Sequence, residues 1–232
     1  MHARTPPPGS SVAGATALAA SPKAALTSGS VLGIRDQLAS NRYFDRGFGC
    51  EAVKVLPGEY FVTSEQMAIV TVLGSCVSAC VRDRMLGVGG LNHFMLPDGT
   101  VGCDARPLSG SARYGVFAME ILINHLLKLG ARREHLEAKV FGGGHVMAKL
   151  AGSQVGERNA EFVLDYLHTE RIPLVAEDLG DIYPRKVYFF PASGRVMVKR
   201  LIELKNGTVM DREREYAHRL HTQPLAGAVE LF

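Results

Sequence analysis

The stretch that decides the fold is residues 67 to 96, MAIVTVLGSCVSACVRDRMLGVGGLNHFML. Its first seven residues form a β-branched-rich apolar run, which is typical of a buried strand. Gly74-Ser75 breaks that run, and alternating apolar residues resume from Cys76 to Val81. Residues 87 to 96 predict another strand, which ends at the turn Pro97-Asp98-Gly99. The stretch therefore predicts consecutive strands joined by short turns.

Residues on both sides of this stretch predict further strands and two helices. The sequence around Pro57-Gly58 predicts a strand, a turn and a strand within residues 52 to 63. Apolar residues at helical spacing predict amphipathic helices at residues 112 to 129 and 157 to 170. Three more strands are predicted at residues 172–176, 186–190 and 195–204. Because strands outnumber helices and several are joined by short turns, the predicted class is α/β (α+β) with a mixed sheet.

The composition is that of an ordinary globular protein. Of the 232 residues, 47% are hydrophobic and 21% are charged, and the net charge is +3. No run approaches the ~18 to 20 apolar residues of a membrane-spanning helix, so no direct membrane insertion is expected. Acidic and basic residues interleave and Trp is absent, so no nucleic-acid partner is expected either.

We predict a single folded domain at residues 51–204, with a segment outside it on each side. Residues 1–50 are predicted as a disordered Pro/Ala/Ser-rich tail and a linking segment, because the first part lacks acidic and aromatic residues and has little apolar surface. A signal peptide is the alternative, but Ser, Gly and Thr interrupt residues 10 to 17. Residues 205–232 are predicted as a charged C-terminal tail that frays.

The cysteines are too few for a disulfide-stapled secreted domain; they are Cys50, Cys76, Cys80 and Cys103. A reducing cytoplasm suits them best, since a thiol can stay free for chemistry there. A zinc site of Cys76, Cys80, His93 and Cys103 is an alternative, but the spacing lacks the paired two-residue knuckles of structural zinc sites. No metal is therefore predicted.

Cys76 and His93 are the candidates for catalysis, since each lies where a predicted strand meets a Gly-containing break. A thiol on a turn at Gly74 would share its space with backbone N–H groups that could hold an oxyanion. An unperturbed thiol has a pKa of about 8.5, so it needs a nearby imidazole to form a thiolate–imidazolium pair near neutral pH. Adjacent short strands would bring His93 beside Cys76. The hydroxyl of Thr71 could accept a hydrogen bond from one imidazole nitrogen and orient the ring.

These residues also have purely structural interpretations. A Cys in an apolar strand is more often a core residue than a nucleophile, and a single His near aliphatic residues is more often only hydrogen-bonded. The glycine run Phe141-Gly-Gly-Gly-His145 could cradle an anion at a helix N-terminus, but it lacks the spacing of a phosphate-binding loop. Tight packing of a strand against a helix is the preferred explanation for its glycines.

Seven short motifs, in order between about residues 51 and 204, resemble the CheD family of chemoreceptor glutamine deamidases. They are Thr-Val-Leu-Gly-Ser-Cys-Val (71–77), Gly-Gly-Leu-Asn-His-Phe-Met-Leu-Pro (89–97), Ala-Arg-Tyr-Gly (112–115), Ala-Lys-Val-Phe-Gly-Gly-Gly (138–144), Gly-Glu-Arg-Asn (156–159), Asp-Leu-Gly (178–180) and Pro-Arg-Lys-Val (184–187). One position departs from the pattern, because Asp181 stands where the family has a second glycine after Asp-Leu-Gly.

The resemblance implies a layered fold of mixed sheets with helices packed on the outside. It also implies hydrolysis of glutamine side-chain amides in the cytoplasmic helices of methyl-accepting chemoreceptors, which yields glutamate and ammonia. Carried over residue by residue, Cys76 is the nucleophile and His93 the base. Thr71 is our choice for the third member of the triad, over Val70 at the alternative offset. No metal or organic cofactor is implied.

Two other functions are compatible with the sequence. CheD relatives also resemble partners of a CheC-type phosphatase, so the chain could act mainly as a chemotaxis docking module. A generic thiol amidase or peptidase with another substrate is the third possibility. A peptidase would cleave main-chain amides, whereas a deamidase leaves the substrate chain whole.

Overall fold

Ten strands and three α-helices lie in the part of the chain that the computed structural model describes, residues 37–97, 110–145, 154–202 and 207–222. The strands are β1 (Asn41–Asp45), β2 (Cys50–Lys54), β3 (Tyr60–Thr63), β4 (Ala68–Leu73), β5 (Val77–Asp83), β6 (Gly89–Asn92), β7 (Leu136–Gly142), β8 (Leu174–Leu179), β9 (Arg185–Phe190) and β10 (Arg195–Arg200). The helices are α1 (Gly110–Lys128), α2 (Val155–Thr169) and α3 (Gly207–Thr222), and a 3₁₀ turn, η2 (Arg133–His135), precedes β7. The predicted tail at residues 1–30 lies outside the described residues.

The strands form two five-stranded sheets, and both are mixed. The first has the order β1-β2-β4-β9-β10, in which only β2 and β4 run parallel. The second has the order β3-β6-β5-β7-β8, in which only β7 and β8 run parallel. The mixed sheet predicted from the sequence is thus confirmed.

Residues 67 to 96 supply one inner strand, β4, to the first sheet and two, β5 and β6, to the second. β4 lies between β2 and β9, and β5 lies between β6 and β7. A strand that is paired on both edges and covered on both faces is apolar throughout rather than alternating. Accordingly, five of the six residues of β4 and six of the seven residues of β5 are buried. The apolar runs in this stretch therefore reflect central positions in the two sheets.

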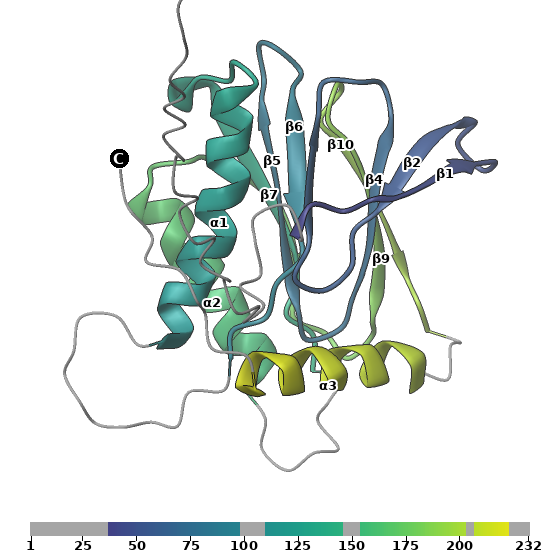
Figure 1. The fold of residues 1–232 in the computed structure, drawn as a ribbon, viewed down its shortest axis with the longest axis vertical. Helices are drawn as coiled ribbons and strands as arrows, with labels where there is room; N and C mark the ends of the chain where they lie inside the picture. Colours follow the sequence, from purple (N-terminus) through teal and green to yellow (C-terminus); the bar gives the residue numbers. More distant parts are fainter. Residues whose placement is uncertain (1–36, 98–109, 146–153, 203–206, 223–232) are drawn as a thin grey trace, which may run out of the picture. The chain divides into compact units, whose positions relative to one another are not determined.

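α1 and α2 pack against the second sheet and against each other. Figure 1 shows both helices on one side of the strands and α3 across one end of them. A continuous core joins both sheets to these helices, and it includes Ile69 of β4, Leu91 of β6 and Val163 of α2. The predicted fold class, layered mixed sheets with helices packed outside in a single α+β domain, is confirmed.

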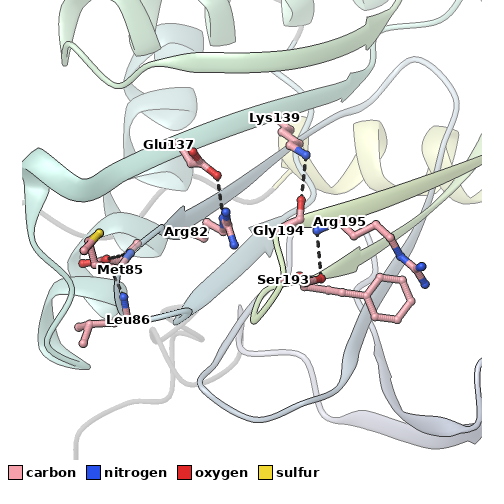
Figure 2. A network of polar contacts seen from close by, with 10 residues as sticks. Arg82, Met85, Leu86, Glu137, Lys139, Ser193, Gly194 and Arg195 are labelled. Carbon is pink, nitrogen blue, oxygen red and sulfur yellow. Dashed lines mark hydrogen bonds and ion pairs between the residues drawn. The ribbon is translucent and has the colours of Figure 1, made fainter.

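A polar network near Arg82, at the C-terminal end of β5, ties the two sheets together (Figure 2). Nε of Arg82 donates to Oε1 of Glu137 at 2.7 Å, and Nζ of Lys139 donates to the carbonyl oxygen of Gly194 at 2.8 Å. A Cβ on Gly194 would overlap the guanidinium of Arg82, and its φ of +70° also favours glycine. The turn between β9 and β10 is thereby fixed against β5 and β7.

Two segments that the sequence places outside the folded domain contain regular structure. β1 lies within residues 31–50, and it pairs with β2 along its whole length. α3 lies within residues 205–232, where the sequence predicts a fraying tail. Its sparse apolar side chains occupy one face, and Tyr216 on that face is buried. Because many residues of this segment are charged, its composition alone does not predict an apolar helix face.

Candidate active site

The thiol of Cys76 and the ring of His93 meet where β5 begins and β6 ends. The backbones of Val77 and Phe94 pair through two N–H to carbonyl bonds of 2.9 and 3.0 Å. Because side chains alternate along strands, Cys76 and His93 project from the same face at diagonal positions of this pair. A ring nitrogen of His93 lies within 4.8 Å of Sγ of Cys76. The proximity that the strand pairing predicts is present.

Thr71 reaches the same ring from the other sheet. Its Oγ1 lies 2.8 Å from Nδ1 of His93 and 2.8 Å from the carbonyl oxygen of Val55. The carbonyl can only accept, so the hydroxyl proton goes to Val55, and Oγ1 accepts from the Nδ1–H of His93. Nε2 of the neutral ring therefore carries no proton, and it has no hydrogen-bond partner among the described residues. The result is a lone pair on Nε2 that no described residue engages.

Glu213 of α3 occupies the N–H groups of the loop that carries Cys76. Its Oε1 accepts from the N–H groups of Gly74 at 2.8 Å and Cys76 at 3.1 Å. Its Oε2 accepts from the N–H of Ser75 at 3.0 Å and from the hydroxyl of Ser75 at 2.7 Å. Glu213 is only 1% exposed. Four donors therefore converge on one carboxylate, which makes the loop an anion-binding site.

Burial and Glu213 set the protonation states of the site. Burial raises the pKa of the Cys76 thiol well above its usual value, and the Glu213 carboxylate raises it further. Burial also lowers the pKa of His93 to about 3, against an opposing contribution from the Val55 carbonyl. Both side chains are neutral near pH 7 in this structure. The thiolate–imidazolium pair that the sequence suggests is therefore disfavoured while Glu213 fills the loop.

The glycine run after β7 supports the loop of Cys76. The N–H groups of Gly143 and Gly144 donate to the carbonyl oxygens of Cys76 and Gly74, each at 2.8 Å. Gly142 has a φ of +110°, and a Cβ there would overlap the carbonyl oxygen of Cys76. Gly74 has no positive φ, so its turn depends on these neighbours rather than on a left-handed backbone of its own. A Cβ on Gly143 would come within 2.8 Å of the carbonyl oxygen of Gly156 in α2. The predicted packing against a helix is therefore present at Gly143, whereas Gly142 and Gly144 approach the backbone of the Cys76 loop.

Asn159 of α2 links the two loops that carry Cys76 and His93. Its Nδ2 donates to the carbonyl oxygen of Ser75 at 2.9 Å, and its Oδ1 accepts from the N–H of Leu96 at 2.8 Å. The side chain is fully buried, so neither bond competes with water. In the sequence, Asn159 stands out only as the last residue of the Gly-Glu-Arg-Asn motif. The structure gives it a positioning role.

Two further motifs, residues 178–181 and 184–187, meet through the buried Arg185. Nη1 of Arg185 donates to the Asp178 carboxylate at 2.8 Å, and its guanidinium also donates to the carbonyl oxygens of Asp178 and Gly180. Asp181, the position that departs from the family pattern, has a φ of +70°. The aspartate therefore keeps the left-handed backbone that a glycine would adopt there, which short polar residues tolerate.

Cys76, His93 and Glu213 are the group of described residues that could hold a metal ion, because one donor atom of each lies within 4.8 Å of the others. Zinc takes such donors in a tetrahedral arrangement. Both carboxylate oxygens of Glu213, however, are turned to N–H groups of the loop. This donor set does not fit a metal as it stands. Of the alternative zinc ligands, Cys80 is outside this group and Cys103 lies outside the described residues.

Glu213 is the site residue that the sequence analysis misses. The sequence feature that could have indicated it is its spacing: Glu213 lies four residues after Val209 and three before Tyr216, so all three share one face of a helix. Tyr216 also reaches the body of the protein, because its hydroxyl and that of Tyr114 are hydrogen-bonded to each other. A single acidic residue within an apolar helix face indicates a buried partner, and here the partner is the Cys76 loop.

Comparisons with known proteins agree on one family. The family model described as "CheD chemotactic sensory transduction" matches residues 95–200, a range that begins after His93. A probable chemoreceptor glutamine deamidase CheD of Thiobacillus denitrificans is 61% identical over 199 residues, which are 86% of this chain and 98% of that protein. A protein of the same name from Methylobacillus flagellatus is 59% identical over the same shares. The relative from Dechloromonas aromatica, named CheD 1, is 62% identical over 85% of this chain and 96% of its own length.

None of the described helices combines the length and the apolar character that crossing a bilayer requires. α1 is the longest of them with 19 residues, and its apolar side faces the second sheet.

Proposed function

The chain belongs to the CheD family, and from this premise we propose that it hydrolyses the side-chain amide of selected glutamines in methyl-accepting chemoreceptors. Similar proteins carry the name chemoreceptor glutamine deamidase. The observation that supports the same chemistry here is the contact between Thr71 and His93 beside the thiol of Cys76. The products are glutamate, which remains in the receptor chain, and ammonia.

Cys76 is the nucleophile in this proposal. Nε2 of His93 takes the proton from Sγ, and the thiolate attacks the carbon of the glutamine carboxamide. As the S–C bond forms, the electron pair of the C=O π bond moves to oxygen and gives a tetrahedral oxyanion. The N–H groups of Gly74 and Cys76, which hold Oε1 of Glu213 in the structure, would hold that oxygen.

His93 then acts as an acid and next as a base. The imidazolium gives its proton to the amide nitrogen, the C–N bond breaks, and ammonia leaves behind a thioester on Cys76. Nε2 takes a proton from water, whose oxygen attacks the thioester, and the sulfur leaves and regains a proton from the imidazolium. A cavity of about 20 Å³, lined by His93, Val72 and Glu213, has room for one such water molecule.

Thr71 positions the ring in every step. Its hydroxyl holds the proton on Nδ1, so that Nε2 is the nitrogen that exchanges protons with Cys76 and with water. The residues listed in these steps supply the whole reaction, and the proposed mechanism needs no metal or organic cofactor.

We place the reaction in the cytoplasm, on the cytoplasmic helices of the receptors. The supporting observation is that Cys50, Cys76 and Cys80 are all free thiols among the described residues. A thiol nucleophile is kept reduced in that compartment. Docking to a CheC-type phosphatase remains the alternative proposal, and it predicts partner binding without deamidation.

Mass spectrometry of a receptor fragment incubated with the protein tests the proposal. Deamidation adds about one mass unit per site and leaves the fragment whole, because an NH₂ group is replaced by OH. The expected result is a Gln-to-Glu change at defined positions, lost in His93→Ala. Main-chain cleavage would point to a peptidase, and an unchanged fragment with retained binding of a CheC-type phosphatase would favour the docking function.

A further inference from the structure

The site is closed to any substrate while α3 is in place. Cys76 is fully buried and His93 is 2% exposed. The cavity beside His93 holds about 20 Å³, enough for a water molecule but far too little for a glutamine side chain. Among the described residues, Glu213 is the side chain that fills the N–H groups of the Cys76 loop, so a glutamine that binds those N–H groups must displace it.

Two side chains on one face of α3 hold it over the site. Glu213 binds the loop of Cys76, and Tyr216, three residues later, is 4% exposed. The hydroxyl of Tyr216 is hydrogen-bonded to that of Tyr114, and its ring lies where a Cβ on Gly58 would come within 2.9 Å of it. Residues three apart lie on the same face of a helix. Glu213 and Tyr216 therefore hold this face of α3 against the site at two neighbouring positions.

The group that α3 places in the loop is chemically the product of the proposed reaction. Deamidation of a glutamine on a helix yields a glutamate side chain on a helix, and Glu213 is such a side chain. Its carboxylate accepts from the N–H of Cys76 itself, within 4.8 Å of the ring nitrogen and the thiol. A carboxylate that only capped the N–H groups of a loop would not also need to lie beside the proposed nucleophile and base, as Glu213 does.

We propose that α3 is an internal product analogue, and that a substrate helix binds in its place with the reactive glutamine at the position of Glu213. This inference rests on the proposed deamidase function and adds the way the substrate is presented. The substrate in this inference is a glutamine presented on a helix that takes the place of α3 at the Cys76 loop.

The isosteric variant Glu213→Gln tests the inference because it converts the analogue into an internal substrate. The amide oxygen would keep the bonds from the N–H groups of Gly74 and Cys76. The NH₂ group would lose the bond from the N–H of Ser75 but could donate to the Ser75 hydroxyl, which can accept as well as donate. Attack by Cys76 would then return residue 213 to glutamate. Peptide mass spectrometry of the purified full-length variant should show a gain of about one mass unit at residue 213 during incubation.

The controls are Glu215→Gln and the double variant Cys76→Ala with Glu213→Gln. Glu215 is exposed on the same helix, so its amide should persist. Conversion at residue 213 that requires Cys76 supports the inference. If the amide at 213 persists while the same preparation deamidates a receptor fragment, or if 215 converts equally, the product-analogue role is wrong and the proposed function stands. If neither residue 213 nor the receptor fragment reacts, the proposed function itself fails.

Discussion

Oγ1 of Thr71 and Nδ1 of His93 lie 2.8 Å apart, although Thr71 belongs to β4 of the first sheet and His93 follows β6 of the second. The packing of one sheet on the other therefore sets the orientation of the imidazole. Both residues are buried, so no water competes for this bond. The proposed base thus depends on the core of the protein as much as on its own loop.

Replacing Thr71 by valine should leave the fold intact and slow the reaction. The variant keeps the shape of the side chain but cannot accept from Nδ1–H, so the ring loses the tautomer that leaves Nε2 free. We expect kcat for ammonia release to fall about 100-fold, at the lower end of general-base contributions, with little change in KM. Thr71→Ser should restore most of the rate. Activity of Thr71→Val within twofold of the wild type would show that the hydroxyl has no positioning role.

Acid should destabilise the protein through His93. The unfolded chain protonates this ring near pH 6.5, whereas the folded chain keeps it neutral down to about pH 3. The stabilising effect of the neutral ring is therefore complete above pH 6.5 and is lost as the pH falls from 6.5 toward 3, by at most about 1.4 kcal/mol per pH unit. Urea unfolding at pH 7, 6 and 5 should show a flatter pH dependence for His93→Gln. Parallel curves for the two proteins would contradict the buried neutral ring.

Asn159 should contribute to stability beyond what an exposed amide does. Asn159→Ala leaves the carbonyl oxygen of Ser75 and the N–H of Leu96 without partners in a buried site. We expect a loss of about 2 to 3 kcal/mol in the free energy of unfolding. Asn124→Ala, which removes an exposed amide on α1, is the matched control and should change it by less than about 0.5 kcal/mol. Equal effects in urea titrations would remove Asn159 from its positioning role.

Alkylation of the cysteines should report whether α3 shields the thiol. Glu213 adds a negative charge that raises the pKa of Cys76, and its removal in Glu213→Ala should favour the reactive thiolate. We expect Cys76 to react with iodoacetamide about tenfold faster in the variant at pH 7.5. Cys80 is buried in β5 and its pKa is raised by burial, so it should stay unreactive in both proteins. Equal rates of Cys76 labelling in the wild type and in Glu213→Ala would show that α3 does not shield the thiol from the reagent.

Most strands could be predicted because their local signals are strong. The apolar run of β4 and the glycine-bounded segments around β5 and β6 carry periodicity and turn residues that tertiary contacts do not override. The assignment of strands to sheets could not be predicted in this way. β2 and β3 are joined by the Pro57-Gly58 turn as expected, yet they belong to different sheets. Only the pairing with distant strands decides that.

The site residues also differ in how far the sequence predicts them, because some contacts join neighbouring strands and others join distant segments. Cys76 and His93 could be placed together because their strands are neighbours in sequence and pair directly. The contact of Thr71 with His93 was suggested by chemistry and a motif, and its geometry required both sheets. Glu213 lies far along the chain in a charged segment that looks like a solvated tail. Its burial depends on four hydrogen-bond donors in the loop of Cys76. That loop is distant in sequence, so the residues around Glu213 do not predict the contact.

The most direct test of the central claim compares two buried cysteines in the same strand region. Wild type, Cys76→Ala and Cys80→Ala are each incubated with a receptor fragment, and the mass of every glutamine-containing peptide is followed. We predict that wild type and Cys80→Ala convert the same glutamines, while the folded Cys76→Ala protein converts none. Conversion by Cys76→Ala at the wild-type rate would contradict the account.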